Sequence, residues 1–187
     1  EVEWFWQLTP NDRFFGFLTV NFLNRIGDVD TSALPLVLTD SLACEDRVGG
    51  CPNISTLDGN RLPYAPVFSA AINYGHDFYI GEGVLSLNAS VNISTSYFLS
   101  IWNVDCYESI AQGGQVCNNG DKQDAYATVD LNVRYTSAYE NWFFEAYGTN
   151  ITDTTYATFN RRNSADGVTG YAFNPRAQFG GRLGYRF

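Results

Sequence analysis

The sequence predicts an all-β protein, a transmembrane antiparallel up-and-down β-barrel with long extracellular loops. Seven segments alternate apolar and polar residues. Most are about 10–14 residues long, whereas strands of soluble proteins average about 5–6. Aromatic residues make up 16% of the chain, and runs of helix-forming residues are missing, which favours strands. Short turns also alternate strictly with long loops, as in barrels that cross a membrane.

The alternation places the seven strands in order along the chain. We expect them at 1–9, 14–25, 65–77, 84–98, 124–136, 141–150 and in the closing stretch 174–187. The clearest is 84–98, where Leu85, Leu87 and Val91 alternate with serines and asparagines. We expect its apolar face, which includes Tyr97, to contact lipid and its polar face to line a wet interior.

Turns and loops follow the same order. Short turns are expected at 10–13, 79–83 and 137–140, and long loops at 26–64, 99–123 and 151–175. An arginine facing lipid near the bilayer midplane would cost about 2–4 kcal/mol. Arg134, Arg182 and Arg186 all fall on polar faces, as a barrel requires. Aromatic residues near the strand ends match the interfaces of such a barrel.

Strand direction predicts that the chain is part of a larger barrel. If the short turns are periplasmic, the last strand ends in the periplasm and the first strand starts outside. Bacterial barrels normally have an even number of strands and two periplasmic ends. We therefore interpret 1–187 as the C-terminal part of a barrel domain, without an internal domain boundary.

Composition excludes several functions. The net charge of −9 and the absence of a basic stripe argue against nucleic acid. No residues form a catalytic set, so we expect no enzyme, and one histidine, His76, gives no metal or cofactor site. The cysteines form two close pairs, for which we expect two local disulfides and an oxidising compartment, with free thiols as the alternative. These pairs are Cys44 with Cys51 and Cys106 with Cys117.

Three motifs resemble TonB-dependent outer-membrane receptors. The stretch 60–66 (NRLPYAP) resembles the segment that opens a downward strand in this family. The stretch 148–156 (GTNITDTTY) is similar to the family's NLTD motif, with Ile151 in place of leucine. Asn174-Pro175-Arg176 with the final GYRF resembles the family's last strand. The order and spacing of the three motifs also agree.

The resemblance implies a twenty-two-stranded barrel with a plug, located in the bacterial outer membrane among lipid and lipopolysaccharide. Such a receptor takes up a scarce ligand, which is a siderophore, cobalamin, haem or an oligosaccharide, with energy delivered by TonB. The plug and the TonB contact lie N-terminal to the segment that this chain matches. The resemblance also implies that Tyr185 and Phe187 form the signal recognised by the barrel-assembly machinery.

Candidate ligand contacts lie in the expected extracellular loops, where aromatic rings can stack and arginines can bind carboxylates. They are Trp102, Tyr107, Tyr156, Phe159, Arg161, Arg162 and Tyr171. Inside the barrel we expect Glu145, Asp130 and Asp124, with Arg134 and Arg182 as partners. Two alternatives stay open: a passive porin, and a secreted disulfide-bonded β-sandwich. The sandwich could be glycosylated at the acceptor motifs of Asn53, Asn88, Asn92 and Asn150.

Overall fold

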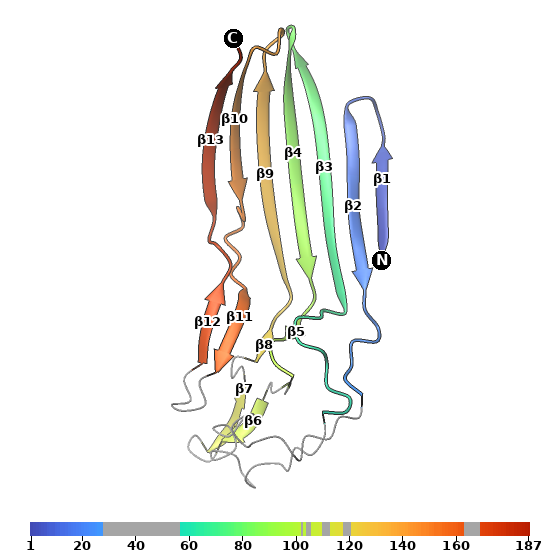
Figure 1. Cartoon of the computed structure of the whole chain (residues 1–187), viewed down its shortest axis with the longest axis vertical. Helices are drawn as coiled ribbons and strands as arrows, with labels where there is room; N and C mark the ends of the chain where they lie inside the picture. Colours follow the sequence, from blue (N-terminus) through green and yellow to red (C-terminus); the bar gives the residue numbers. More distant parts are fainter. Residues whose placement is uncertain (28–56, 102, 104–105, 110–112, 118–120, 163–168) are drawn as a thin grey trace.

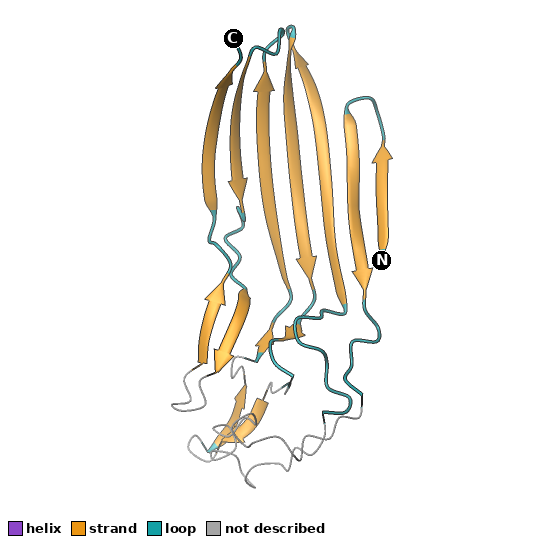
Figure 2. Ribbon diagram, viewed as in Figure 1, coloured by secondary structure: helices purple, strands orange, loops and turns teal. Residues whose placement is uncertain are grey.

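The structure is a computed structural model that describes residues 1–27, 57–101, 103, 106–109, 113–117, 121–162 and 169–187. Figure 2 shows strands and loops, with no helix in the part of the chain that is described. None of the described residues forms a helix long and apolar enough to cross a membrane.

One antiparallel sheet of seven strands dominates the fold (Figure 1), in the order β1-β2-β3-β4-β9-β10-β13. These strands are β1 (Val2–Gln7), β2 (Asp12–Val20), β3 (Phe68–Ile80), β4 (Gly83–Ser94), β9 (Tyr126–Thr136), β10 (Trp142–Thr149) and β13 (Gln178–Tyr185). Each strand pairs with its neighbour in the meander, so the seven predicted strands and their up-and-down order are confirmed. The sheet is open, with β1 and β13 at its edges.

The ends of the sheet differ as the sequence predicts. The turns β1–β2, β3–β4 and β9–β10 lie at one end, together with the end of β13, and the long connections lie at the other end (Figure 1). The β3–β4 turn is tighter than predicted, because Tyr79 and Ile80 still pair with β4. Only Gly81 and Glu82 remain in the turn, and Gly81 has a φ of +63°, which suits a two-residue hairpin turn.

Six further strands lie in the long connections. Five of them fall in segments that the sequence analysis treated as loops, and one, Tyr97–Phe98, falls at the end of the strand predicted at 84–98. The six strands form three small antiparallel pairs: β5 (Tyr97–Phe98) with β8 (Lys122–Gln123), β6 (Cys106–Ser109) with β7 (Gly114–Cys117), and β11 (Ala157–Arg162) with β12 (Thr169–Phe173). Their strands are only two to six residues long, too short for a clear alternation.

The two faces of the large sheet have opposite chemistry, and two adjacent rows of paired residues show it. The row across β13, β10, β9, β4 and β3 is Leu183, Phe144, Tyr135, Leu85 and Phe78. The next row is Arg182, Glu145, Arg134, Ser86 and Asp77. We call the first the apolar face and the second the polar face.

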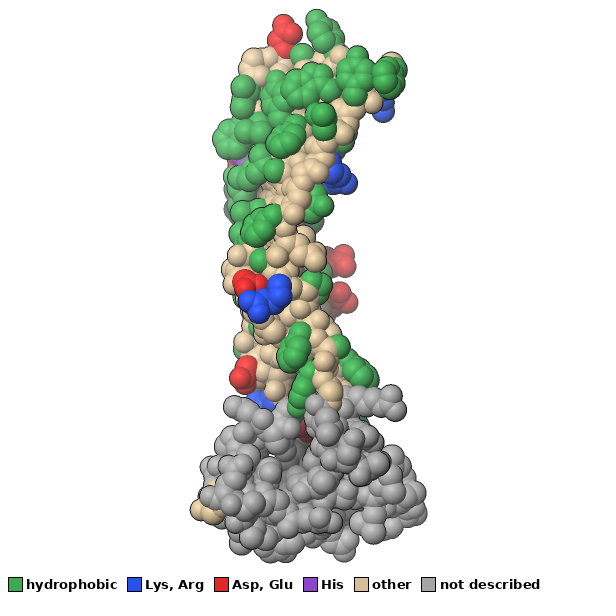
Figure 3. All heavy atoms as spheres, turned by 90° about the vertical axis from the view of Figure 1, so that its left-hand side faces the viewer, with side chains coloured by type: hydrophobic (Ala, Val, Ile, Leu, Met, Phe, Trp, Pro, Cys, Tyr) green, Lys and Arg blue, Asp and Glu red, His purple; other side chains and the backbone are tan. Residues whose placement is uncertain are grey.

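Large hydrophobic side chains of the apolar face are exposed rather than packed in a core. Phe144 and Leu183 are 51% and 77% exposed, and hydrophobic side chains cover much of the molecule near the short-turn end (Figure 3). No second sheet covers this face in the described chain, whereas a β-sandwich would pack one against it. The one hydrophobic core cluster among the described residues lies at the loop end, formed by Tyr97, Leu99 and Ala157.

Glycines on the polar face allow rings on neighbouring strands to lie flat across the sheet. A Cβ on Gly180 would come within 2.5 Å of the Tyr147 ring, and one on Gly184 within 2.1 Å of the Phe143 ring. Both glycines stand directly opposite these aromatic residues in the β10–β13 register. The ring of Phe143 also lies 3.8 Å from the Arg134 guanidinium, a cation–π contact.

A tyrosine pocket at the loop end of the polar face

Four aromatic residues from separate parts of the chain meet where the sheet joins the long connections. Phe17 is on β2, Tyr64 precedes β3, Tyr97 is on β5 and Tyr126 starts β9. They line a pocket of about 300 Å³, which we call the tyrosine pocket. Its other lining residues are Pro66, Ser69, Ala70, Asn92, Ile93 and Ser94. Aromatic walls with a few polar groups are typical of small-molecule sites.

Backbone contacts hold two of these tyrosines in place. The Tyr64 amide donates to Phe98 O at 2.9 Å, and its hydroxyl accepts from the Asn160 amide at 3.3 Å. The Tyr97 hydroxyl donates to Ala157 O at 3.4 Å. Burial, together with the nearby Tyr126, raises the pKa of Tyr97 well above its usual value. Tyr97 is therefore neutral at physiological pH.

The position of Tyr97 corrects the sequence analysis, which placed its side chain on the lipid-facing side of a strand at 84–98. The strand β4 ends at Ser94, and Tyr97 is only 7% exposed within the hydrophobic cluster. The Thr95 hydroxyl accepts from the Phe68 amide at 3.0 Å, and the Thr95 amide donates to Phe68 O. These bonds end the ladder, so the alternation no longer determines the direction of Tyr97.

Tyr156 joins the same cluster from the connection between β10 and β11. Its ring stacks on Tyr126, with the centroids 3.9 Å apart and the planes 6° from parallel. Its amide donates to Asn174 Oδ1 at 2.7 Å, and its carbonyl accepts from the Asn174 amide at 3.0 Å. Among the predicted ligand contacts whose side chains are described, Tyr156 is the one that lies beside the pocket.

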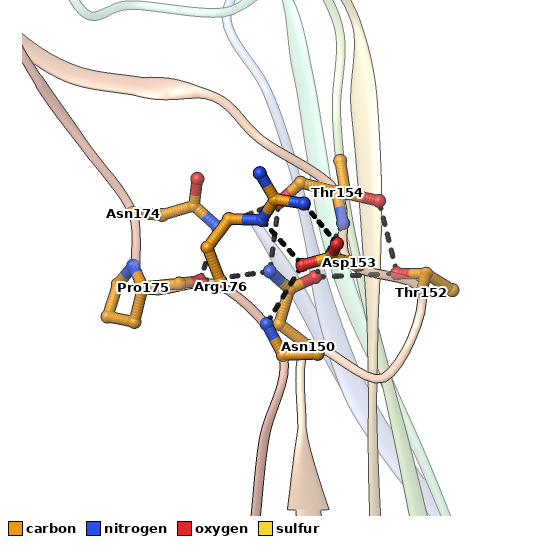
Figure 4. A network of polar contacts seen from close by, with 8 residues as sticks. Asn150, Thr152, Asp153, Thr154, Asn174, Pro175 and Arg176 are labelled. Atoms are coloured by element: carbon orange, nitrogen blue, oxygen red, sulfur yellow. Dashed lines mark hydrogen bonds and ion pairs between the residues drawn. The ribbon is translucent and has the colours of Figure 1, made fainter.

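A network of polar contacts, drawn in Figure 4, fixes the segment that carries Tyr156. The Nδ2 of Asn150 donates to Thr154 O and Pro175 O, at 2.9 and 3.0 Å, and its Oδ1 accepts from the Thr154 amide at 3.0 Å. The Nδ2 of Asn174 donates to the same two carbonyls. Together with the Asp153–Arg176 pair, we call this network the clamp.

Asp153 and Arg176 close the clamp where the connection leads into β13. Arg176 Nε donates to Asp153 Oδ1 at 2.7 Å, Arg176 also contacts Asp153 Oδ2, and the Ala177 amide donates to Oδ1 at 3.0 Å. These donors hold the pKa of Asp153 well below its usual range. Asn150 and Asp153 have φ values of +48° and +52°, a region that Asn and Asp tolerate better than other residues with a Cβ.

Charged residues toward the short-turn end of the sheet pair with one another on the polar face. Glu145, whose side chain is 3% exposed, contacts Arg182 and lies 3.6 Å from Arg134. Asn132 Nδ2 donates to Glu145 Oε1 at 2.7 Å. Further along the same row, Asp77 pairs with Arg13 at 2.8 Å and accepts from the Ser86 hydroxyl at 2.6 Å. We call this set the ionic row.

The expectation for the three interior carboxylates is met in part. Glu145 pairs with both predicted arginines, whereas Asp130 accepts from the Asn150 amide at 2.7 Å. Asp124 lies outside the strand, which begins at Tyr126. A second groove, of about 370 Å³, lies between the ionic row and the tyrosine pocket and includes Asn88, Ser90 and Asn132 in its wall.

His76, set aside as a ligand in the sequence analysis, lies on the apolar face, with Nδ1 2.6 Å from Asp12 Oδ1. The Tyr74 hydroxyl donates to the same oxygen at 2.7 Å. The contact therefore pairs the imidazole with a carboxylate. In the described part of the chain, no group of three or more metal-ligating side chains comes together.

The remaining predicted site residues are distributed as follows. Phe159 and Tyr171 lie on the exposed β11–β12 hairpin, at 52% and 37% exposure. Arg161 and Arg162 end β11 and Tyr107 lies on β6, but their side chains are outside the described part. Trp102, Cys44 and Cys51 lie outside the described residues altogether. Ligand binding by the six aromatic and arginine residues stays a prediction, and so does the disulfide between Cys44 and Cys51.

Two other sets were predicted from the sequence. Cys106 stands opposite Cys117 in the β6–β7 register, which suits a disulfide, although that bond stays a prediction. The Tyr185 and Phe187 rings pack edge to face, 5.1 Å apart, and both are exposed. Their role as an assembly signal also stays a prediction.

The residues that line the tyrosine pocket were missed as a site. Phe17, Tyr64, Tyr97 and Tyr126 are far apart in sequence, and no spacing rule connects them. The available signal was the position of each one close to a strand end on the long-loop side. Only the sheet register shows that these ends meet.

No protein-family model and no curated protein matches this sequence. Solved structures do match. The ferric yersiniabactin uptake receptor FyuA of Yersinia pestis superposes with a TM-score of 0.63 at 17% identity, over 97% of this chain and 22% of that one. The ferric preacinetobactin receptor BauA of Acinetobacter baumannii gives 0.56 at 14% identity, over 97% of this chain and 20% of its own. The siderophore receptor PiuA of the same organism gives 0.57 at 14%, over 96% and 20%.

Proposed function

We propose that this chain is the C-terminal part of the barrel of an outer-membrane receptor that takes up a scarce ligand with energy from TonB. The chain has the fold of a section of outer-membrane receptor barrels and spans about a fifth of the length of the three receptors. Those proteins are receptors rather than enzymes. A plug, a TonB contact and the rest of the barrel would belong to a longer protein.

The observation that supports this proposal best is the pair of adjacent rows with opposite chemistry. Exposed Leu183 and Phe144 suit lipid, and the ionic row beside them suits a wet interior. Only a barrel pairs every backbone group of its strands within a bilayer. Lipid and the barrel-assembly machinery are therefore the partners proposed for the sheet, and a small ligand is proposed for the tyrosine pocket.

Neighbouring positions of β4 test the membrane assignment. Val91 is on the apolar face, opposite Ile72 and Val129, and Ser90 is on the polar face, opposite Asn73 and Asp130. In the intact protein, Val91→Arg should lower assembly, because an arginine facing lipid costs up to about 2–4 kcal/mol. Ser90→Arg is the matched control and should assemble.

Assembly is measured as heat-modifiable migration of the outer-membrane fraction. Equal assembly of the two variants, or solubility without detergent, would contradict a membrane barrel. Energy coupling is tested separately, by comparing ligand uptake in cells with and without TonB. Uptake that persists without TonB would favour a passive porin instead.

A further inference from the structure

The wall between the tyrosine pocket and the ionic row has the chemistry of a site for an uncharged, hydroxyl-rich ligand. None of the described residues that line the tyrosine pocket is charged. Two of its rings, Phe17 and Tyr64, are each 43% exposed. Tyr64 is fixed through its amide and its hydroxyl, so its ring loses little freedom when a ligand binds.

Three polar side chains on β4 have unused hydrogen-bonding groups. Asn92 lines the tyrosine pocket, and Ser90 and Asn88 line the adjoining groove. None of the three side chains makes a hydrogen bond to another described residue. The flanking serines of the same face differ, since Ser86 donates to Asp77 and Ser94 donates to Thr95 O. We call Asn88, Ser90 and Asn92 the amide strip.

The strip connects the two grooves along one strand. Alternate residues of a strand face the same side and follow one another every two residues, about 7 Å. The three side chains therefore offer a line of donors and acceptors from the pocket toward mid-sheet. Amides and hydroxyls can both donate and accept, which matches the hydroxyl groups of a sugar.

The arginines of this wall are already paired with carboxylates. Arg134 and Arg182 contact Glu145, and Arg13 contacts Asp77. Recognition of an anionic chelate relies on arginine or lysine forming charge-assisted bonds to carboxylates. An anion in the groove would compete with Glu145 for Arg182 and would lie near Asp130, which also lines it.

We propose that the ligand taken up is an uncharged oligosaccharide. Phe17 and Tyr64 stack on the C–H faces of its rings at the pocket, where the electron-rich aromatic face attracts polarised hydrogens. Asn92 then hydrogen-bonds the hydroxyl groups of the oligosaccharide. As the oligosaccharide moves inward, Ser90 and then Asn88 take over these hydrogen bonds. The proposal rests on the uptake function above and narrows its ligand class.

The test measures binding to the intact protein in detergent by titration calorimetry. The probes are neutral hexasaccharides, namely α-1,4-glucan, β-1,4-glucan, β-1,4-xylan and β-1,4-mannan. Ferric citrate and a ferric catecholate are the anionic comparison. At least one hexasaccharide should bind, and the two chelates should not. Phe17→Ala and Asn92→Ala should each weaken that binding about tenfold.

Matched variants distinguish a specific loss of ligand binding from a general loss of folding. Phe144→Ala removes a ring of similar exposure (51%) from the apolar face and should leave the affinity unchanged. Asn88→Ala, further along the strip, should lower uptake by cells more than affinity. Phe17→Leu serves as a second variant if Phe17→Ala does not show heat-modifiable migration.

Three results would overturn the proposal: binding of a chelate but of no hexasaccharide, binding of none of the probes, or affinities unchanged by Phe17→Ala and Asn92→Ala. Binding of a chelate would leave the uptake function standing and reject only the oligosaccharide. Failure of the intact protein to reach the outer membrane would instead reject the uptake function.

Discussion

Replacing Asn150 tests whether the clamp holds the tyrosine cluster together. Asn150→Ala removes the three side-chain hydrogen bonds to Thr154 and Pro175, which are 2.9–3.0 Å long. At about 1 kcal/mol each, these contribute about 3 kcal/mol. The φ of +48° adds about 1 kcal/mol for alanine. We therefore expect a loss of about 4 kcal/mol against opening of this connection.

Asn150→Gly separates the two contributions. Glycine loses the same hydrogen bonds but tolerates a positive φ, so its cost should be about 3 kcal/mol. Asn141→Ala is the control, because Asn141 lies in the β9–β10 turn, where it accepts from the Ser137 hydroxyl, at the opposite end of the sheet.

Hydrogen exchange of the Tyr156 amide gives the readout. That amide donates to Asn174 Oδ1 and not to Asn150, so it reports on the clamp as a unit. In the intact protein its protection should fall about a thousandfold in Asn150→Ala and about a hundredfold in Asn150→Gly. Asn141→Ala should leave it unchanged. Wild-type protection of Tyr156 in Asn150→Ala would refute a clamp that acts as one unit.

Three further predictions concern other parts of the molecule. Glu145→Ala should lower the unfolding free energy by about 3 kcal/mol, because two arginines and Asn132 lose their common acceptor. The control Glu82→Ala, in an exposed turn, should change it by no more than about 0.5 kcal/mol. Equal melting temperatures of the two variants would contradict a stabilising role of the ionic row. The raised pKa of Tyr97 means that its packing stabilises the fold below pH 10, the ordinary value, and that this contribution is lost as the pH rises further. In an absorbance titration at alkaline pH, the tyrosine that ionises last in the wild-type protein should therefore be missing from Tyr97→Phe. Identical titration curves of the two proteins would reject the raised pKa of Tyr97. Cys106 and Cys117 should be linked in peptide maps made without reductant, since opposed strand residues lie about 4.5–5.5 Å apart at Cα; free thiols at both would exclude the bond.

The seven-stranded sheet could be predicted because each strand has one apolar face and one polar face. That requirement imposes alternation along the whole strand. The strand ends could not be predicted in this way. Phe22 and Leu23 continue an apolar segment, yet β2 ends at Val20, and these side chains are 80% and 91% exposed. Hydrogen bonds, such as that from the Asn21 amide to Val67 O, decide where pairing stops.

The candidate site was predicted far less completely than the sheet. The motif around Asn150 and Asn174 is visible in the sequence, and it proves to be the clamp that fixes Tyr156. The tyrosine pocket needs Phe17, Tyr64 and Tyr126 to be close together, which depends on the pairing of four strands and the path of two connections. Pairwise register is long-range information that residue alternation does not contain.

Two glycines of β13 fix the register in which this strand pairs with β10. Tyr147 and Phe143 are four residues apart on β10, and Gly180 and Gly184 are four apart on β13. A slip of two residues would set Arg182 against one of the rings, where no space for a side chain exists. A slip of one would turn the arginines of β13 to the apolar face. The β10–β13 register is therefore the alignment in which both rings lie opposite a glycine.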